Sequence, residues 1–217
     1  MPDSGETGYT AERFVETMLE LIVEQGGSVN VNLRQISRRL GCAHTNAYNY
    51  FASYDDLRWA AFRRALRIYG EYLVSEVDPS MTPRQYLHRV IAALATFPEQ
   101  HPGVYRFIAS DPIDLERLPR DILTSAAHMK RWLSEVFLIA SGPRADQTEA
   151  EEASNIVLAY IDGETLNLIN GRVVPGEDVR GRIVDNALRL FDLLTASIPG
   201  EPVAEAGGSS GYQYPDI

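Results

Sequence analysis

Residues 44–50 carry a dense run of hydrogen-bonding side chains whose types suit contact with nucleic-acid bases and phosphates. The run consists of imidazole, hydroxyl, amide and phenol groups from His44, Thr45, Asn46, Tyr48, Asn49 and Tyr50. Amide side chains can pair with the edge of adenine, and the methyl group of threonine can contact the methyl group of thymine. The chemistry that this segment suggests is therefore recognition through hydrogen bonds.

Two short helices around a glycine would present these side chains on one surface. Leu33, Ile36 and Leu40 have the spacing of an apolar stripe on a first helix. Gly41 follows, where a residue that tolerates positive φ lets the chain leave the helix. This pattern predicts a helix-turn-helix unit, whose second helix enters the DNA major groove. The alternative is a helical hairpin in an ordinary bundle, with a polar second helix that faces solvent.

The sequence on both sides of this unit supports the helix-turn-helix prediction. An amphipathic helix precedes it, and the segment from Ser53 to Asp56 has the form of a capping box that opens a long helix. In the order of its helices, the segment of residues 9–70 resembles the N-terminal domain of the TetR family of transcriptional regulators. That domain has a Tyr-x-Tyr-Phe motif close to the recognition helix and a serine that caps the fourth helix. The matching residues here are Tyr48, Tyr50, Phe51 and Ser53.

The resemblance implies a ligand-responsive transcriptional regulator, most often a homodimeric repressor that binds double-stranded DNA at a near-palindromic operator. It implies that the major groove is contacted by Thr45, Asn46, Tyr48 and Asn49. It implies that phosphates are contacted by Asn32, Arg34, His44 and Tyr50. The half-sites of such an operator lie about one helical turn of DNA, or a multiple of it, apart.

The chain departs from the pattern of the family at three positions. His44 and Tyr54 stand where the family usually has lysines that contact phosphate, and Ala43 stands where a serine usually caps the recognition helix. Without that serine, one backbone N–H at the start of the helix lacks its side-chain acceptor. The departures leave a second hypothesis open, namely an all-α protein of the same fold that has lost DNA binding and binds a small molecule or a protein partner.

The charge of the chain is distributed unevenly. Between residues 30 and 70 there are seven arginines and two aspartates, a net charge of +5. The whole chain carries −10, so the remaining residues carry −15. A local basic surface can attract phosphate while the acidic remainder limits nonspecific adhesion. Some of the arginines, four of which fall on the predicted fourth helix, are expected only to face solvent.

The fold class predicted from the sequence is all-α, with a three-helix DNA-binding domain followed by a larger helical domain for ligand binding and dimerisation. We expect a flexible segment over residues 1–8, the helix-turn-helix domain over 9–53, the larger domain over 54–198 and a disordered tail over 199–217. Within the larger domain, Pro98 is expected to end one helix and Thr148 to cap another.

The resemblance also implies an effector pocket in the centre of the second domain, although the match there is weak. Such pockets are mostly apolar with a few placed polar groups. The residues expected to line it are Tyr105, Met129, Trp132, Asp162 and Asn167. Most other large apolar residues in these helices are expected to be ordinary core. If Asp162 faced inward it would need a partner, either an arginine or a cationic or hydroxylated ligand, because an unpaired buried carboxylate is costly.

The last two helices are expected, by the same resemblance, to form the homodimer interface. Their apolar residues are Val157, Tyr160, Ile161, Leu168, Ile183, Leu190, Leu193 and Leu194. Two helices from each subunit would form an isologous four-helix bundle. A glycine in the middle of a helix costs about 1 kcal/mol relative to alanine. Close approach of two backbones across the interface would explain Gly163.

Enzyme motifs are scarce in this chain, which contains no Gly-x-Ser-x-Gly elbow, no phosphate-binding loop and no His-Glu-x-x-His. The four histidines lie far apart, and the single cysteine, Cys42, excludes an internal disulfide and a multi-cysteine metal site. We therefore expect no enzymatic activity, no metal and no cofactor. The polar start of the chain is unlike a signal peptide, and no apolar run is long enough to span a membrane. These features predict a cytoplasmic protein without membrane contact.

Overall fold

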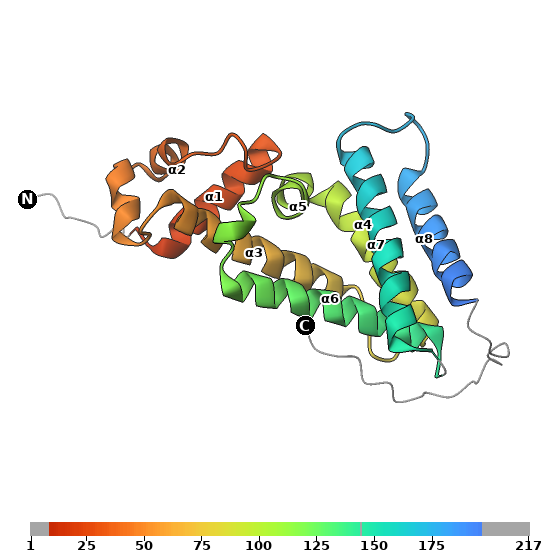
Figure 1. Cartoon of the computed structure of the whole chain (residues 1–217). Coiled ribbons are helices and arrows are strands. Elements are labelled where there is room, and N and C mark those ends of the chain that lie inside the picture. The colour runs from red at the N-terminus through yellow and green to blue at the C-terminus, as the bar shows by residue number, and fades with distance from the viewer. Residues whose placement is uncertain (1–8, 144, 197–217) are drawn as a thin grey trace, which may run out of the picture. The chain divides into compact units, whose positions relative to one another are not determined.

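A computed structural model describes residues 9–143 and 145–196, and this part of the chain is built from helices without any strand. Figure 1 shows the helices in chain order. They are α1 (Ala11–Gln25), α2 (Leu33–Leu40), the 3₁₀ helix η1 (His44–Asn49), α3 (Tyr54–Ser75), α4 (Pro83–Gln100), α5 (Pro102–Ala109), the 3₁₀ helix η2 (Leu115–Arg117), α6 (Arg120–Ser141), α7 (Gln147–Ile169) and α8 (Val179–Thr195). The all-α fold predicted from the sequence is confirmed.

The helices form two compact units. The first contains the described residues of Met1–Ile68 and His101–Pro119, and the second those of Tyr69–Gln100 and Arg120–Ile217. The division does not coincide with the predicted domain boundary after residue 53, because the first four turns of α3 and all of α5 belong to the first unit. The predictions of a flexible segment over 1–8 and a disordered tail over 199–217 fall outside the described residues.

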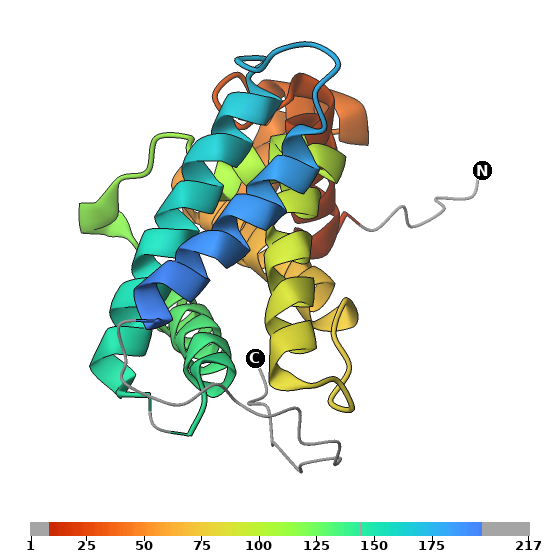
Figure 2. The same ribbon diagram turned by 90° about the vertical axis from the view of Figure 1, so that its right-hand side faces the viewer.

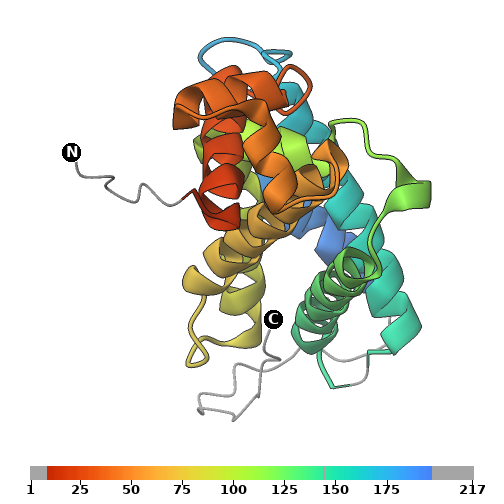
Figure 3. The same ribbon diagram turned by 90° about the vertical axis from the view of Figure 1, so that its left-hand side faces the viewer.

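The first unit packs α1, α2, α3 and α5 around one apolar core. Fully buried side chains come from each of these helices, among them Phe14, Ile36, Leu57 and Phe107. The rings of Phe62 and Phe107 meet edge to face with centroids 5.3 Å apart, so they join α3 to α5 in a geometry that aromatic pairs prefer. Figure 3 shows α1 and α2 of this unit in red and orange.

The second unit has its own core, formed by α4, α6, α7 and α8. The buried side chains include Leu87, Trp132, Phe137, Val157 and Phe191. The helices α7 and α8 lie side by side as an antiparallel pair joined by a loop (Figures 1 and 2). No described helix is both long enough and apolar enough to cross a lipid bilayer.

One helix start that the sequence predicted is confirmed, and one predicted helix end is wrong. The side chain of Ser53 accepts from the Asp56 amide at 3.1 Å, as the predicted capping box requires. The predicted end at Pro98 is wrong, because α4 continues to Gln100 with the proline buried inside its last turn. So close to the end of a helix, proline removes one hydrogen bond and does not interrupt the turns that precede it.

The start of α7 also differs from the prediction. The helix begins at Gln147, and its cap is Asp146, not Thr148. The Asp146 carboxylate accepts from the amide of Thr148 at 2.8 Å and from that of Glu149 at 3.3 Å. A carboxylate near the N-terminus of a helix also interacts favourably with the helix dipole, which a threonine hydroxyl does much less.

Candidate nucleic-acid interface

The helix α2 has well-defined ends. The Asn32 side chain accepts from the Gln35 amide at 3.1 Å, and the Gln35 side chain accepts from the Asn32 amide at 2.9 Å, which completes a reciprocal capping box. At the other end Gly41 has φ of 71°, the left-handed conformation expected for the turn. Ile36 is fully buried and anchors the helix in the core. The predicted turn at Gly41 is confirmed.

The element η1, which the sequence predicted to be an ordinary second helix that recognises DNA, is a 3₁₀ helix of six residues. It has no side-chain cap, because Ala43 occupies the cap position, as the sequence indicated. Its ends are closed by bonds between residues three apart, from the Asn46 amide to the Ala43 carbonyl and from the Tyr50 amide to the Ala47 carbonyl, each 3.0 Å long. Such tightened turns satisfy terminal backbone groups where no capping side chain does so.

The side chains of η1 point mainly to solvent. Ala47 is its buried residue. Exposed side chains come from His44, Thr45, Tyr48, Asn49 and the following Tyr50, while Asn46 is half-buried. Tyr48 is 53 % exposed, which is high for a large aromatic side chain. An exposed row of amide, hydroxyl and phenol groups on a short helix after a glycine turn has the chemistry required to read base edges.

Tyr50 is held to the segment before α1. Its hydroxyl donates to the Tyr9 carbonyl, and the hydroxyl of Tyr9 in turn donates to the Gly41 carbonyl at 3.3 Å. The ring of Tyr50 also lies 5.9 Å from that of Phe14. Tyr9 therefore connects the turn before η1 with the residue after it. The hydroxyl proton of Tyr50 is thus engaged within the first unit, and its expected contact with phosphate stays a prediction.

Tyr54, one of the departures from the family pattern, forms an internal contact. It is the first residue of α3, and its hydroxyl donates to the Val31 carbonyl at 2.6 Å, just before the cap of α2. The side chain is half-buried, and this burial raises its pKa above the ordinary value, because the phenolate is disfavoured in an apolar environment. The hydroxyl thus remains a donor over the whole physiological range.

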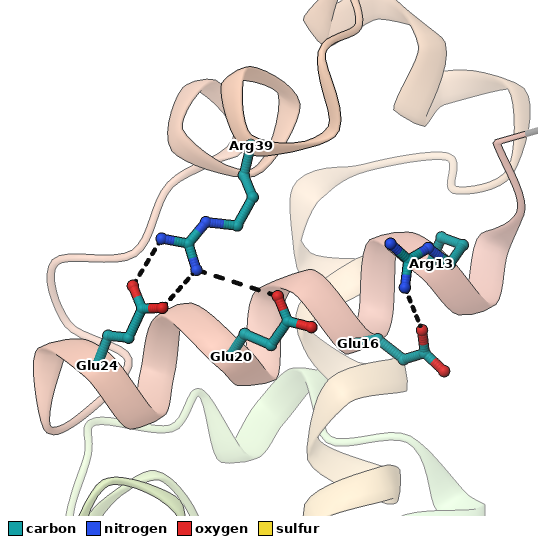
Figure 4. Close-up of polar contacts among 5 residues, drawn as sticks. All are labelled: Arg13, Glu16, Glu20, Glu24 and Arg39. Atoms are coloured by element: carbon teal, nitrogen blue, oxygen red, sulfur yellow. Dashed lines mark hydrogen bonds and ion pairs between the residues drawn. The ribbon is translucent and has the colours of Figure 1, made fainter. Parts of the chain in front are cut away.

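The basic residues of this region are not all available to DNA. Figure 4 shows Arg39 of α2 bonded to the carboxylate of Glu24 on α1 through two N–O distances of 2.5 and 2.7 Å, with Glu20 at 4.0 Å. The hydrogen bond from Arg39 lowers the pKa of Glu24. A second ion pair, between Arg13 and Glu16, lies within α1 at 3.0 Å.

Two arginines of α2 remain available. Arg34 and Arg38 are exposed, and neither has an ion-pair partner among the described residues. Asn32, also expected to contact phosphate, is exposed but has its side chain engaged in the capping box. Because Arg39 is paired, the positive charge that α2 can present to phosphates is smaller than its number of arginines suggests.

The residues expected to line an effector pocket fall in both units. Tyr105 is buried in α5 of the first unit, whereas Met129 and Trp132 on α6 and Asp162 and Asn167 on α7 belong to the second. Trp132 is a buried core residue. Asp162 is exposed, and Glu164, two residues further along α7, pairs with Arg182 at 3.1 Å. An effector pocket lined by all five residues stays a prediction.

The described residues contain no group of three or more histidine, cysteine, aspartate or glutamate side chains placed to hold a metal ion. The local sequence gave no signal for several contacts that fix this region, such as those of Tyr9, Arg106 and Asp111. Each of them joins segments more than 30 residues apart, and only the folded chain brings these together.

Solved structures with a similar fold include transcriptional regulators. A TetR-family regulator from Streptomyces coelicolor aligns with a TM-score of 0.67 at 16 % identity, covering 86 % of this chain and 82 % of its own. A TetR-like regulator from Rhodococcus sp. RHA1 aligns with a TM-score of 0.59 at 15 % identity, covering 85 % and 92 %. The chain has a TetR-like fold. At these identities the likeness concerns the fold alone.

A protein that is related in sequence is also named as a transcriptional regulator. The HTH-type transcriptional regulator BetI of Brucella anthropi is 29 % identical over 92 residues, which are 42 % of this chain and 47 % of BetI. The chain thus matches about half the length of this relative. No protein-family model matches the chain. The TetR-like resemblance that the motifs suggested is confirmed at the level of the fold.

Proposed function

We propose that this protein is a sequence-specific DNA-binding transcriptional regulator, acting as a homodimeric repressor that a small-molecule effector releases from its operator. The observation that carries the proposal is the exposed polar face of η1, presented by a helix-turn-helix unit in a TetR-like fold. The BetI relative, named as an HTH-type transcriptional regulator, supports it.

In this proposal, some side chains of η1 and α2 contact the bases of DNA and others contact its phosphates. Base edges would be read by Thr45, Asn46, Tyr48 and Asn49. Phosphates would be contacted by Arg34 and His44, with Asn32 at the start of α2. Tyr50 would hold η1 in position and would not contact phosphate. Phosphate oxygens only accept hydrogen bonds, and the hydroxyl of Tyr50 already donates to the Tyr9 carbonyl. Phosphate contacts would set the register, and the contacts to bases would give specificity.

The proposed homodimer would form through α7 and α8. Ile156 on α7 and Leu193 on α8 are 48 % and 63 % exposed, and Tyr160, Leu190 and Leu194 are half-buried. Three residues expected at the interface belong to the core of the chain instead, since Val157, Ile161 and Ile183 are buried within one subunit. The remaining apolar side chains would give the surface that each subunit contributes to a four-helix bundle.

Gly163→Ala tests this interface. Apart from the adjacent residues and the backbone of α7 itself, no described atom lies within 4 Å of a Cβ added at this position. In a monomer, alanine would therefore stabilise α7 by up to about 1 kcal/mol. If a second subunit approaches here, the same methyl group weakens the dimer instead, which sedimentation over a range of concentrations measures. A dimer of unchanged affinity would place the interface elsewhere.

Release by an effector requires that the ligand bind more tightly to the dimer conformation that does not fit both half-sites. It follows that operator DNA and effector weaken each other's binding by the same factor. Titration of an identified effector in the presence and absence of operator measures both factors. Unequal factors at equilibrium would contradict the linked two-state scheme.

The DNA-binding proposal is tested by selecting from random-sequence duplexes with the purified protein and then measuring affinity for the enriched motif at several salt concentrations. Tyr48→Ala is expected to abolish the enrichment of a palindromic motif. Arg34→Ala should weaken binding to all sequences and lower the slope of log K against log salt by about 1. Arg172→Ala, which removes the same charge from an exposed position in the α7–α8 loop, serves as the control and should leave both quantities unchanged.

The same experiment tests a second function, which is favoured by the pairing of Arg39 with Glu24. This is a protein of the same fold that has lost DNA binding and binds a small molecule or a protein partner. No enrichment at low salt from a folded dimer would support this function over the first.

A further inference from the structure

The loop of residues 26–31, which connects α1 to α2, is held by side chains from elsewhere in the first unit. The Asp111 carboxylate accepts from the Ser28 amide at 2.6 Å. The Arg106 guanidinium donates to the Gly26 carbonyl at 3.0 Å. The Tyr54 hydroxyl donates to the Val31 carbonyl. Three backbone groups of this short loop are thus bonded to side chains of α5, of the segment after α5, and of α3, and not to water.

The helix α5 is itself fixed against the end of α1. A Cβ added at Gly103 would lie 2.6 Å from the Ile22 carbonyl oxygen and 3.1 Å from the Cα of Val23. Only glycine permits this approach, because both neighbours are backbone atoms that cannot move aside. Arg106 lies almost one turn further along α5, and Asp111 follows two residues after its end. The position of both side chains relative to the loop is therefore determined by the α1–α5 contact.

The loop in turn determines where α2 begins. Val31 is buried, and the next residue, Asn32, is the cap of α2. The recognition element η1 starts four residues after α2 ends, so a displacement of the loop would be transmitted to both helices. Ser28 is buried, and its amide would lack the Asp111 acceptor if the loop moved. Leaving a buried donor unsatisfied is costly.

We propose that Asp111, assisted by Arg106, is a positioning residue for DNA recognition. By holding the α1–α2 loop at Ser28 it fixes the orientation in which α2 and η1 meet the duplex, although it does not touch the DNA itself. The inference rests on the DNA-binding function proposed above. It identifies a residue that lies more than 60 positions after η1 and that no local motif marks.

The test compares three variants of the full-length protein. Asp111→Ala removes the acceptor, and Asp111→Asn keeps a side-chain oxygen that can accept from Ser28. Asp114→Ala is the matched control, because it removes an exposed carboxylate three residues away that bonds to the nearby Glu116 and Arg117 in the described part of the chain. For each variant we would measure operator affinity, nonspecific affinity, the fraction of protein that is active, and amide hydrogen exchange of residues 28–50.

Asp111→Ala is expected to weaken operator binding about tenfold, as the loss of one acceptor to a buried amide would. Nonspecific duplex binding should change less than about twofold, since phosphate attraction depends little on helix orientation. Asp111→Asn should restore most of the operator affinity, and Asp114→Ala should resemble the wild type. Exchange should accelerate at Ser28 and through α2 and η1 in Asp111→Ala alone.

Two results would overturn the proposal. One is a lower active fraction or melting temperature of Asp111→Ala with an unchanged operator Kd in the active molecules, which indicates a structural role only. The other is unchanged exchange over residues 28–50. If the wild type binds no operator, the proposed function fails, and the exchange comparison still decides whether Asp111 positions α2 and η1.

Discussion

The two helices of the helix-turn-helix unit are stabilised in different ways. The helix α2 carries its own start and stop signals, namely the Asn32–Gln35 capping box and the left-handed Gly41, and it buries Ile36. The element η1 has neither a side-chain cap nor an apolar stripe, and Ala47 is its buried residue. Its position depends on neighbours, above all on the contacts of Tyr50 with Tyr9 and Phe14.

This difference shows how a polar recognition surface can exist on a small domain. A helix that must expose most of its side chains gains little from burial, so its conformation must be imposed from outside. The cost of ordering η1 is offset by contacts with α1, α2 and Tyr9, and α1 and α2 are anchored by buried side chains such as Phe14 and Ile36. The two helices should therefore respond to mutation in opposite ways, with stability sensitive in α2 and DNA binding sensitive in η1.

The largest expected effect on stability is that of Ile36→Ala. Removing a fully buried isoleucine side chain should lower the free energy of unfolding by about 2–5 kcal/mol. Tyr48→Ala should change it by no more than about 0.5 kcal/mol, because the side chain is mostly exposed. Urea denaturation of both variants measures the contrast. Equal destabilisation by the two substitutions would mean that η1 is packed more tightly than the structure describes.

The next effect concerns the cap of α2. Asn32→Ala should lower the free energy of unfolding by about 1 kcal/mol, because the backbone amide of Gln35 loses its side-chain acceptor and the capping box is broken. Asn32→Ser, which can still cap, should cost much less. Thermal and urea unfolding of the pair would check this, and an equal loss in both variants would assign the effect to a contact other than the cap.

A smaller effect, of the opposite sign, is expected at η1. Ala43→Ser would supply the missing cap and should raise the free energy of unfolding by about 0.5–1 kcal/mol. Ala126→Ser, at an exposed position inside α6, should give no gain. If Ala43→Ser is also neutral in urea unfolding, the start of η1 is fixed by its neighbours so completely that a local cap adds nothing.

The smallest effect is the part of the contribution of Tyr54 that is lost at alkaline pH. Below the ordinary tyrosine pKa of about 10, the wild type should be more stable than Tyr54→Phe by about 1 kcal/mol, because it has the bond to Val31. Burial raises the pKa of Tyr54 in the folded state. As the pH rises above the unfolded value, the unfolded chain ionises first, and the advantage of the wild type shrinks. Urea unfolding at neutral and alkaline pH checks this, and an advantage that is constant with pH would contradict it.

The parts of this architecture that local sequence determines were predictable. Gly41 and Ser53 are short-range signals, since a left-handed turn and a hydroxyl cap need only residues within one turn. The apolar spacing around Ile36 indicated which face of α2 is buried. The end of α4 was not predictable from Pro98 alone, because packing in the core outweighs one lost backbone bond.

The candidate site was predictable in composition but less so in geometry. The polar residues 44–50 could be recognised as an exposed surface, whereas the 3₁₀ form of η1 depends on the absence of a cap together with long-range contacts. The role of Tyr50 could not be inferred, because Tyr9 lies about 40 residues earlier. The role proposed for Asp111 could not be inferred either, because nothing near it in sequence indicates that Ser28 is its partner.

The ion pair between Arg39 and Glu24 has a thermodynamic consequence for the encounter with a duplex. A guanidinium that already neutralises a carboxylate displaces few of the counterions condensed on DNA when it approaches a phosphate. Among the arginines of α2, the entropy gained from releasing those ions then comes from Arg34 and Arg38, and little of it from Arg39. Such a protein would be held to arbitrary DNA only weakly, and the discrimination between sequences would fall to the uncharged side chains of η1.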